Sequence, residues 1–329
     1  MKEEEIRNRD VFNRYLDLVE SDVKNDFDFK SFTKTNCLAC DSCDLTIEFE
    51  KLGFIYTSCR RCDTLFVNPR PPFESLKKFY STSSSTSFWV NEFFKPVAEI
   101  RREKIFRPRA EYIAEMLSVN KGLVIGDIGA GFGLFLKELK KILPDNNYIA
   151  IEPSVEMADI CHGKGLEIKC KYLEEMGSAE CKFDFLSAFE LLEHLFDPIS
   201  FLNKAYSLLN TGGYLFLTTL NGKGFDISLL WEKSKSISPP HHLNFFNTTS
   251  IKHLLERLGF EVIDVSTPGK LDWDIVEGMI INESIDLGRF WNLLAREGDQ
   301  KCKNELQDWV SNNNLSSHMR ILVKKELIK

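Results

Sequence analysis

The stretch 123–133, Leu-Val-Ile-Gly-Asp-Ile-Gly-Ala-Gly-Phe-Gly, places the strongest constraint on how this chain of 329 residues can fold. It begins with three apolar residues, as does a strand that is buried on both faces of a sheet. Asp127 closes the strand, and Gly129, Gly131 and Gly133 form a turn in which no side chain obstructs a ligand. Apolar residues at helical spacing from 135 to 143 predict a helix behind the turn. Strand, turn and helix together predict a nucleotide-binding unit with free backbone N–H groups at the helix start.

The next predicted strand, 148–151, ends in Glu152. A carboxylate about 20 residues beyond such glycines can accept hydrogen bonds from both hydroxyls of a ribose. The turn reads Gly-x-Gly-x-Gly rather than the Gly-x-Gly-x-x-Gly of dinucleotide-binding proteins, so a dehydrogenase is the alternative interpretation of this stretch. Asp-x-Gly-x-Gly-x-Gly before an acidic strand end resembles the class I S-adenosylmethionine-dependent methyltransferases.

That resemblance implies S-adenosylmethionine as cofactor and a set of residues that bind it. The three glycines would pass close to the methionine part of the cofactor, and Glu152 would hold its ribose. The cofactor-binding residues that the resemblance implies are Asp127, Gly129, Ala130, Gly131, Gly133, Glu152, Pro153, Phe189 and Glu190.

Strand and helix patterns alternate along the rest of the chain, which predicts a doubly wound α/β sheet. The resemblance extends through the motifs at 183–186, 190–194 and 209–214, and it implies seven strands with the last antiparallel. The predicted strands are 123–125, 148–151, 166–170, 183–189, 214–219, 260–265 and 320–324.

Two Cys-x-x-Cys pairs, Cys37 with Cys40 and Cys59 with Cys62, are separated by eighteen residues. Two such knuckles can place four thiolates tetrahedrally around one zinc ion, and 46–49 and 54–57 are expected to pair as short strands between them. Cys43 could replace one ligand. Because four cysteine ligands leave no open position, we expect a structural zinc site.

The chain as a whole resembles bacterial methyltransferases that carry an N-terminal zinc ribbon and often serve sugar or surface-polysaccharide pathways. The stretches that carry this closer resemblance are 59–72, 239–246, 259–274 and 315–319. The expected organisation is an N-terminal helical arm (1–36), a zinc ribbon (37–72), a linker with helices that pack on the cofactor domain (73–118), and a cofactor domain (119–329) with a helical cap inserted at 268–318. The polar stretch 80–87 is expected to be a loop or lid.

Composition limits the class of protein. The net charge of −7 argues against a nucleic-acid partner, which usually requires a basic face. No apolar run approaches the ~20 residues of a membrane span, and Met-Lys-Glu-Glu-Glu does not begin a signal peptide, so we expect a cytoplasmic protein without a membrane partner. The odd number of cysteines, 9, then favours ligands and core residues over a disulfide framework. The cap could serve as a homodimer contact as well as a cover for the site.

The connection at 220–247, here called the histidine loop, contains Pro-Pro-His-His-Leu-Asn-Phe-Phe. Methyl transfer is an in-line displacement, and a hydroxyl acceptor also has to lose a proton, a task suited to histidine near neutral pH. His241 and His242 are therefore the leading candidates for a general base, and Asn244 could orient the substrate. His318, which follows the cap, is a further candidate.

Other interpretations stay open. Glu190, Glu193 and His194 have the Glu-x-x-Glu-His spacing that is associated with a divalent cation in quinone-pathway O-methyltransferases, and a basic run at 101–109 is either a solvated helix face or an anion site. The expected function is methyl transfer to a small molecule, a sugar or nucleotide-linked sugar. The alternatives are a quinone-like O-methyltransferase, a non-catalytic zinc-ribbon binding module, and an RNA methyltransferase.

Overall fold

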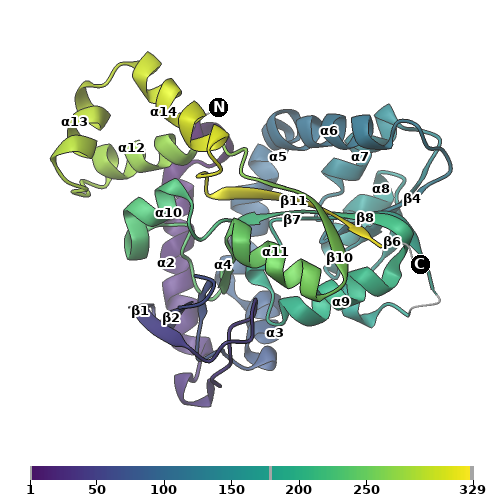
Figure 1. Cartoon of the computed structure of the whole chain (residues 1–329), viewed down its shortest axis with the longest axis horizontal. Coiled ribbons are helices and arrows are strands. Elements are labelled where there is room, and N and C mark those ends of the chain that lie inside the picture. The colour runs from purple at the N-terminus through teal and green to yellow at the C-terminus, as the bar shows by residue number, and fades with distance from the viewer. Residues whose placement is uncertain (1, 178–179, 327–329) are drawn as a thin grey trace. The chain divides into compact units, whose positions relative to one another are not determined.

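The short apolar runs form a seven-stranded sheet with the order β10-β11-β8-β7-β4-β5-β6 (Figure 1), as the sequence predicts for a methyltransferase-like α/β fold. Neighbouring strands from β8 to β6 run parallel. The order reverses between β4 and β7, and ligands of doubly wound sheets bind at such a reversal. The strands are β4 (Val124–Ile128), β5 (Asn147–Ile151), β6 (Glu167–Lys169), β7 (Phe183–Phe189), β8 (Leu209–Leu220), β10 (Phe260–Ser266) and β11 (His318–Lys325).

The computed structural model describes residues 2–177 and 180–326, and the chain divides into two units. We call Ala98–Thr218, Lys252–Val265 and Ile321–Lys329 the sheet unit, and Met1–Val97, Thr219–Ile251 and Ser266–Arg320 the ribbon–cap unit. Within the described residues, no helix has both the length and the apolar character needed to cross a membrane.

In the sheet unit, α6 and α7 lie on one side of the sheet and α9 on the other (Figure 1). The apolar stripes of α6 and α7 and buried Cys161 of α8 pack on Ile125, Phe185 and Phe216 of the strands to form one core. Asp197 caps α9 by accepting hydrogen bonds from the N–H groups of Ile199 and Ser200. The helices are η3 (Arg102–Phe106), α6 (Arg107–Leu117), α7 (Leu134–Ile142), α8 (Val155–Gly163), η4 (Leu173–Glu175), η5 (Leu192–His194), α9 (Pro198–Leu208) and α11 (Thr248–Arg257), which begins in the other unit.

The ribbon of the ribbon–cap unit is a four-stranded sheet in the order β1-β2-β3-β9. Its strands are β1 (Leu45–Lys51), β2 (Phe54–Cys59), β3 (Leu65–Val67) and β9 (Asn244–Phe245). The first two match the predicted hairpin. The sequence did not predict β3 or β9, because each is too short to show an alternating pattern.

Helices make up the rest of the ribbon–cap unit. In the cap, Trp273, Val276 and Ile280 of α12 form a small core with Leu230 of α10 and Ala295 of α13. The helices are α1 (Glu3–Ile6), α2 (Arg9–Asp26), η1 (Phe29–Ser31), α3 (Phe73–Thr82), α4 (Ser84–Phe88), η2 (Trp89–Phe94), α5 (Lys95–Arg101), which ends in the sheet unit, α10 (Phe225–Leu230), η6 (Trp231–Lys233), α12 (Asp272–Asn282), α13 (Arg289–Glu297) and α14 (Gln300–Asn312).

The prediction that 80–87 is a loop or lid is wrong, because these residues continue α3 and form most of α4. Ser83 separates the two helices, and its hydroxyl caps α4 by accepting a hydrogen bond from the N–H of Thr86. The side chain of Asp22 on α2 accepts a hydrogen bond from the N–H of Ser85. Small polar residues here accept hydrogen bonds from the free N–H groups at the start of a helix. Composition alone does not distinguish such a helix start from a loop.

Two buried carboxyl groups lie at the base of the cap. Asp272, the first residue of α12, is 3% exposed and accepts hydrogen bonds from the side chains of Gln307 and Ser316 and from the N–H of Ser317. Asp226 on α10 is 1% exposed. Burial, and then the charges of Asp272 and Glu3, raise the pKa of Asp226 to about 7, and the Ser317 hydroxyl only partly opposes them.

We expect Asp226→Asn to flatten the pH dependence of stability. An unfolded aspartate has a pKa of about 3.9, so between about pH 4 and pH 7 the folded chain holds a proton that the unfolded chain has lost. Stability therefore falls as the pH rises through this window and levels off above pH 7. In denaturant unfolding, the free energy of unfolding of the variant minus that of the wild-type chain should increase by roughly 1 to 4 kcal/mol from pH 4.5 to pH 8. Asp308→Asn, at an exposed site on α14, is the control; profiles for Asp226→Asn that run parallel to wild type would contradict the assignment.

Candidate active site and cysteine cluster

The glycine turn lies at the end of β4 in the sheet unit. Asp127 on this strand is 2% exposed, and its carboxylate accepts a 2.7 Å hydrogen bond from the Ser187 hydroxyl of neighbouring β7. Burial raises the pKa of Asp127 to about 7. Gly129, Gly131 and Gly133 all have left-handed backbone angles, with φ of 65°, 54° and 66°. The turn thus requires glycine for its backbone shape, and Asp127 ties its base to the sheet.

The glycines differ in what surrounds them. A Cβ on Gly133 would lie 2.7 Å from Leu166 and 2.9 Å from Cys161, so this glycine allows α7 to pack closely. A Cβ on Gly131 would meet no protein atom within 4 Å. The space beside Gly131 is therefore open to a ligand that approaches the backbone.

Glu152 follows β5 and faces the same turn. It is 6% exposed, and its two carboxylate oxygens accept hydrogen bonds from the N–H groups of Gly131, at 2.8 Å, and Ser154, at 2.9 Å. Burial raises the pKa of Glu152, and these two N–H groups oppose that shift. The carboxylate is thus held beside the open side of the turn, where its remaining lone pairs can accept hydrogen bonds from a diol.

A third strand end brings Glu190 to this edge of the sheet unit. Its φ of 49° is unusual for a residue with a side chain. One carboxylate oxygen accepts hydrogen bonds from Arg109, at 3.0 Å, and from the Thr218 hydroxyl, at 2.6 Å. The Arg109 guanidinium also lies 4.9 Å from the centre of the Phe189 ring. The sequence places Arg109 in the basic run 101–109 but does not predict its pairing with Glu190, because the two residues are far apart in the chain.

The rest of the basic run is largely paired with acids of the helices. Arg102 forms ion pairs with Glu99, Glu103 and Glu138, and Arg107 pairs with Glu103 and Glu111. These contacts fit the solvated-face interpretation for exposed Arg107, whereas the Arg102 side chain is 17% exposed and pairs with buried Glu138 of α7.

The histidine loop lies in the ribbon–cap unit, where His241 is 7% exposed. Its ring centre lies 5.6 Å from that of Tyr15, 5.0 Å from Phe79 and 5.4 Å from Tyr80. Burial, with a smaller contribution from His242, lowers the pKa of His241 to about 3. An imidazole with so low a pKa is neutral near pH 7, but it is a weak proton acceptor.

His242 is half-buried and held by the loop itself. Its Nδ1 lies 2.5 Å from the carbonyl oxygen of Ser236, and its backbone N–H donates to the carbonyl of Ser238. Since a carbonyl only accepts, Nδ1 carries the hydrogen and Nε2 carries the lone pair. This is the tautomer that a general base acting through Nε2 requires.

Asn244 and His318 complete the set of predicted catalytic residues. Asn244, on β9, is fully buried, and its side-chain oxygen accepts a 2.9 Å hydrogen bond from buried Arg70. Sequence analysis did not single out Arg70. His318 is the half-buried first residue of β11.

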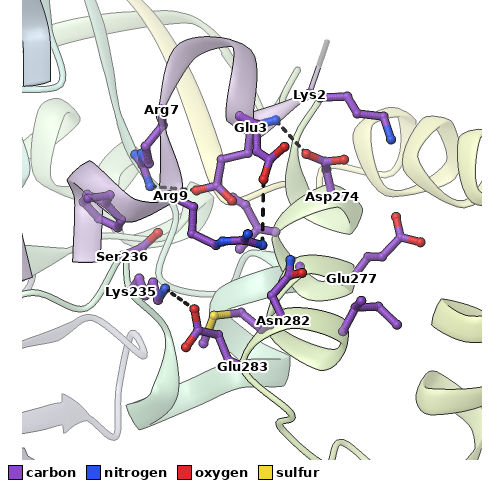
Figure 2. A pocket seen from close by; sticks show the side chains of 16 residues that line it. Lys2, Glu3, Arg7, Arg9, Lys235, Ser236, Asp274, Glu277, Asn282 and Glu283 are labelled. Carbon is purple, nitrogen blue, oxygen red and sulfur yellow. Dashed lines mark hydrogen bonds and ion pairs between the residues drawn. The ribbon is translucent and has the colours of Figure 1, made fainter. Parts of the chain in front are cut away.

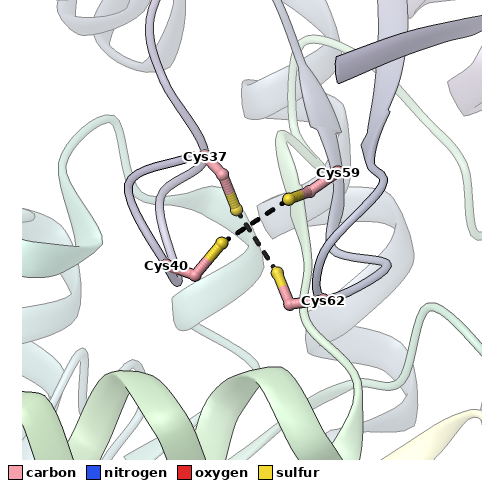
Figure 3. A group of neighbouring side chains, drawn as sticks. All are labelled: Cys37, Cys40, Cys59 and Cys62. Atoms are coloured by element: carbon pink, nitrogen blue, oxygen red, sulfur yellow. Dashed lines mark hydrogen bonds between the residues drawn. The ribbon is translucent and has the colours of Figure 1, made fainter. Parts of the chain in front are cut away.

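The four predicted zinc ligands converge in the ribbon (Figure 3). The Sγ atoms of Cys37 and Cys62 are 3.4 Å apart, those of Cys40 and Cys59 are 3.5 Å apart, and all four lie within 4.8 Å of one another. Zn–S bonds of about 2.3 Å in a tetrahedron give sulfur separations close to these values. Cys43 is exposed and outside the cluster. The donor set therefore fits a closed, structural zinc site.

A cavity of about 430 Å³ lies between the N-terminal arm and α12, and none of the predicted site residues lines it (Figure 2). Charged groups that line it pair with one another: Arg7 with Glu3 at 3.2 Å and Lys235 with Glu283 at 2.9 Å. The N–H of Glu3 also donates to Asp274 at 2.6 Å. These contacts attach the arm to the cap, and we assign the cavity no ligand.

The chain belongs to the methyltransferase domain family, whose pattern matches residues 97–265, more than half of the chain. The ubiquinone biosynthesis O-methyltransferase of Parvibaculum lavamentivorans is 30% identical over 146 residues, which cover 40% of this chain and 58% of that protein. The protein of the same name from Dinoroseobacter shibae is 29% identical over 200 residues, which cover 57% of this chain and 75% of that protein. The chain therefore spans little more than half the length of the first of these relatives.

Solved structures show the same fold. The plantazolicin methyltransferase BpumL, in complex with a monoazolic desmethylPZN analog and SAH, superposes with a TM-score of 0.51 and 14% identity, covering 77% of this chain and 94% of that one. A putative methyltransferase complexed with the Haloferax volcanii Trm112 activator gives a TM-score of 0.51 and 13% identity, covering 73% and 96%. At these identities the likeness concerns the fold alone.

We expect Gly131→Ala to weaken S-adenosylmethionine binding by roughly tenfold or more, because a methyl group would occupy the open side of the turn. Gly122→Ala is a matched control: φ is 72° there, and an added Cβ also meets nothing within 4 Å, but the residue lies outside the turn. Both variants should lose similar stability from backbone strain. Titration calorimetry with S-adenosylmethionine should separate them, and equal affinities for the two variants would remove Gly131 from the cofactor site.

We also expect purified protein to contain about one zinc ion per chain. Cys62→Ser should lose the metal, whereas Cys43→Ser, a matched change at the exposed cysteine, should keep it. Mass-spectrometric metal analysis of protein prepared without chelator measures both. An absence of metal from wild-type protein would refute the site, and loss of zinc only from Cys43→Ser would show that the ligand set is wrong.

Proposed function

We propose that the chain transfers a methyl group from S-adenosylmethionine to a small-molecule acceptor. The observation that carries this proposal is the Glu152 carboxylate held beside Gly131, where a Cβ would meet open space. A buried carboxylate that accepts only one N–H bond on each oxygen can also bind the two hydroxyls of a ribose. Membership of the methyltransferase domain family supports this assignment over a dehydrogenase.

For the acceptor, we propose a sugar or a nucleotide-linked sugar. The support is the resemblance to zinc-ribbon methyltransferases of sugar pathways, together with the cap formed by α12, α13 and α14. The second candidate is a quinone-like phenol, which the names of the relatives favour. The cysteine cluster as an RNA reader is less favoured because the chain is acidic.

Within the histidine loop, we assign the proton transfer to His242 rather than His241. The cofactor supplies an electrophilic methyl group on a sulfonium. Nε2 of His242 would accept the proton that the acceptor hydroxyl loses as it is methylated. The Ser236 carbonyl stabilises the resulting imidazolium through Nδ1–H. Burial makes His241 too weak a base for this step.

The remaining predicted residues would bind and orient. Asn244, whose side-chain oxygen accepts a hydrogen bond from Arg70, would orient the acceptor. Glu190, held by Arg109 and Thr218, would line the cofactor site at the edge of the sheet where these strands end. His318 is retained as a second proton acceptor if His242 is not the base.

The experiment is a methyl-transfer assay with S-adenosylmethionine against a panel of nucleotide sugars and catechols. For the accepted substrate, His242→Gln should lower kcat about 10²- to 10⁴-fold while cofactor affinity stays nearly unchanged. His253→Gln, at an exposed position on α11, is the matched control and should retain wild-type kcat. Transfer to catechols but not to nucleotide sugars would reject the sugar acceptor in favour of a quinone-like phenol. A kcat for His242→Gln within a few-fold of wild type would shift the base to His318.

A further inference from the structure

The histidine loop contacts the ribbon along its whole length. Near its start, Lys223 forms a 2.5 Å ion pair with Asp63, the residue after the last cysteine ligand. In its middle, Trp231 packs edge-on against Phe49 of β1, with ring centres 5.2 Å apart. Lys51, the last residue of β1, donates a 2.8 Å hydrogen bond to the carbonyl of Ser234.

The histidines themselves adjoin the ribbon sheet. Tyr56 on β2 is fully buried, and its hydroxyl donates a 2.7 Å hydrogen bond to the backbone carbonyl of His242. The N–H of Val67 donates to the carbonyl of Leu243, and β9 then pairs with β3. A two-residue strand has little stability of its own, so β9 depends on the ribbon for its position.

Asn247 connects the end of the loop to the second cysteine knuckle. It is 1% exposed, and its side-chain amide donates hydrogen bonds to the carbonyls of Cys62, at 2.8 Å, and Asp63, at 3.1 Å. Its side-chain oxygen accepts from the N–H groups of Thr249 and Ser250, and so caps α11. One side chain thus binds a zinc knuckle through its nitrogen and a helix start through its oxygen.

We propose that the zinc ribbon is the scaffold of the histidine loop, and that Asn247 is the positioning residue that ties the loop to the Cys59–Cys62 knuckle. The inference rests on the proposed function, in which His242 acts on the acceptor. The bound ion would hold the four cysteine side chains together, so the knuckle owes its order to that ion. The carbonyls of Cys62 and Asp63 have fixed positions only while that order persists. Zinc at the ribbon therefore sets the geometry of His242 without touching substrate or cofactor.

Asn247→Asp is the diagnostic substitution. A carboxylate still accepts from Thr249 and Ser250 and remains a good helix cap, but it cannot donate to the two knuckle carbonyls and repels them. The ligand cysteines are unchanged, so the variant should keep about one zinc per chain. Asn8→Asp is the matched control, since Asn8 caps a different helix, α2, by accepting a 3.1 Å hydrogen bond from the N–H of Val11.

The primary measurement is the NMR spectrum of the histidine rings, which needs no acceptor. Asn247→Asp should shift or broaden the His242 ring signals and leave those of His162, on α8 in the sheet unit, in place. Removal of zinc from the wild-type chain with a chelator should change the same His242 signals. Where an accepted substrate is known, kcat of Asn247→Asp should fall roughly 10- to 100-fold with cofactor affinity retained.

Unchanged His242 signals in Asn247→Asp, or after removal of zinc that metal analysis confirms, would overturn the proposal. So would equal changes in Asn8→Asp, which would indicate a general effect of the added charge. If Asn247→Asp does not fold, the chelation of the wild-type chain decides. A wild-type chain that holds no zinc would also overturn the proposal, because the ribbon would then lack the ion to which its order is attributed. Failure of methyl transfer with His242 signals that respond as expected would reject the proposed function and leave the scaffold intact.

Discussion

The hydrogen bond from the N–H of Gly131 to the carboxylate of Glu152 is the contact on which the candidate cofactor site depends. It joins the ends of two adjacent parallel strands, β4 and β5, and β4 also borders the reversal of the sheet order between β4 and β7. The turn can present that N–H only because glycine tolerates the left-handed backbone there. Asp127 beneath the turn and α7 behind it then hold the arrangement in place.

Much of this could be predicted from the sequence because it is local. A buried strand followed by glycines and a helix has one common structural solution, and the paired Cys-x-x-Cys knuckles have another. All seven predicted strands are present within a few residues of their expected positions, although β8 begins at Leu209 rather than at Tyr214. The four cysteines converge, and Cys43 is exposed and lies outside the cluster.

The features that could not be predicted are contacts between distant segments. The pairing of Arg109 with Glu190 joins a helix to a strand end, and no spacing rule relates the two. The different environments of His241 and His242 arise from three aromatic rings, two on α3 and one on α2, that surround only the first histidine. Burial among these rings lowers the pKa of His241, an effect of tertiary packing that the sequence does not display.

The ribbon sheet pairs strands that are far apart in the chain, and this has a consequence for biosynthesis. Strand β3 ends at Val67, but its partner β9 begins at Asn244, about 180 residues later in translation. At 5–20 residues per second, the edge of β3 stays open for roughly 10 to 35 seconds while the intervening chain is made. An open edge of this kind can pair with another nascent chain on the same polysome. Because β3 is short, it exposes few unpaired backbone groups for such pairing.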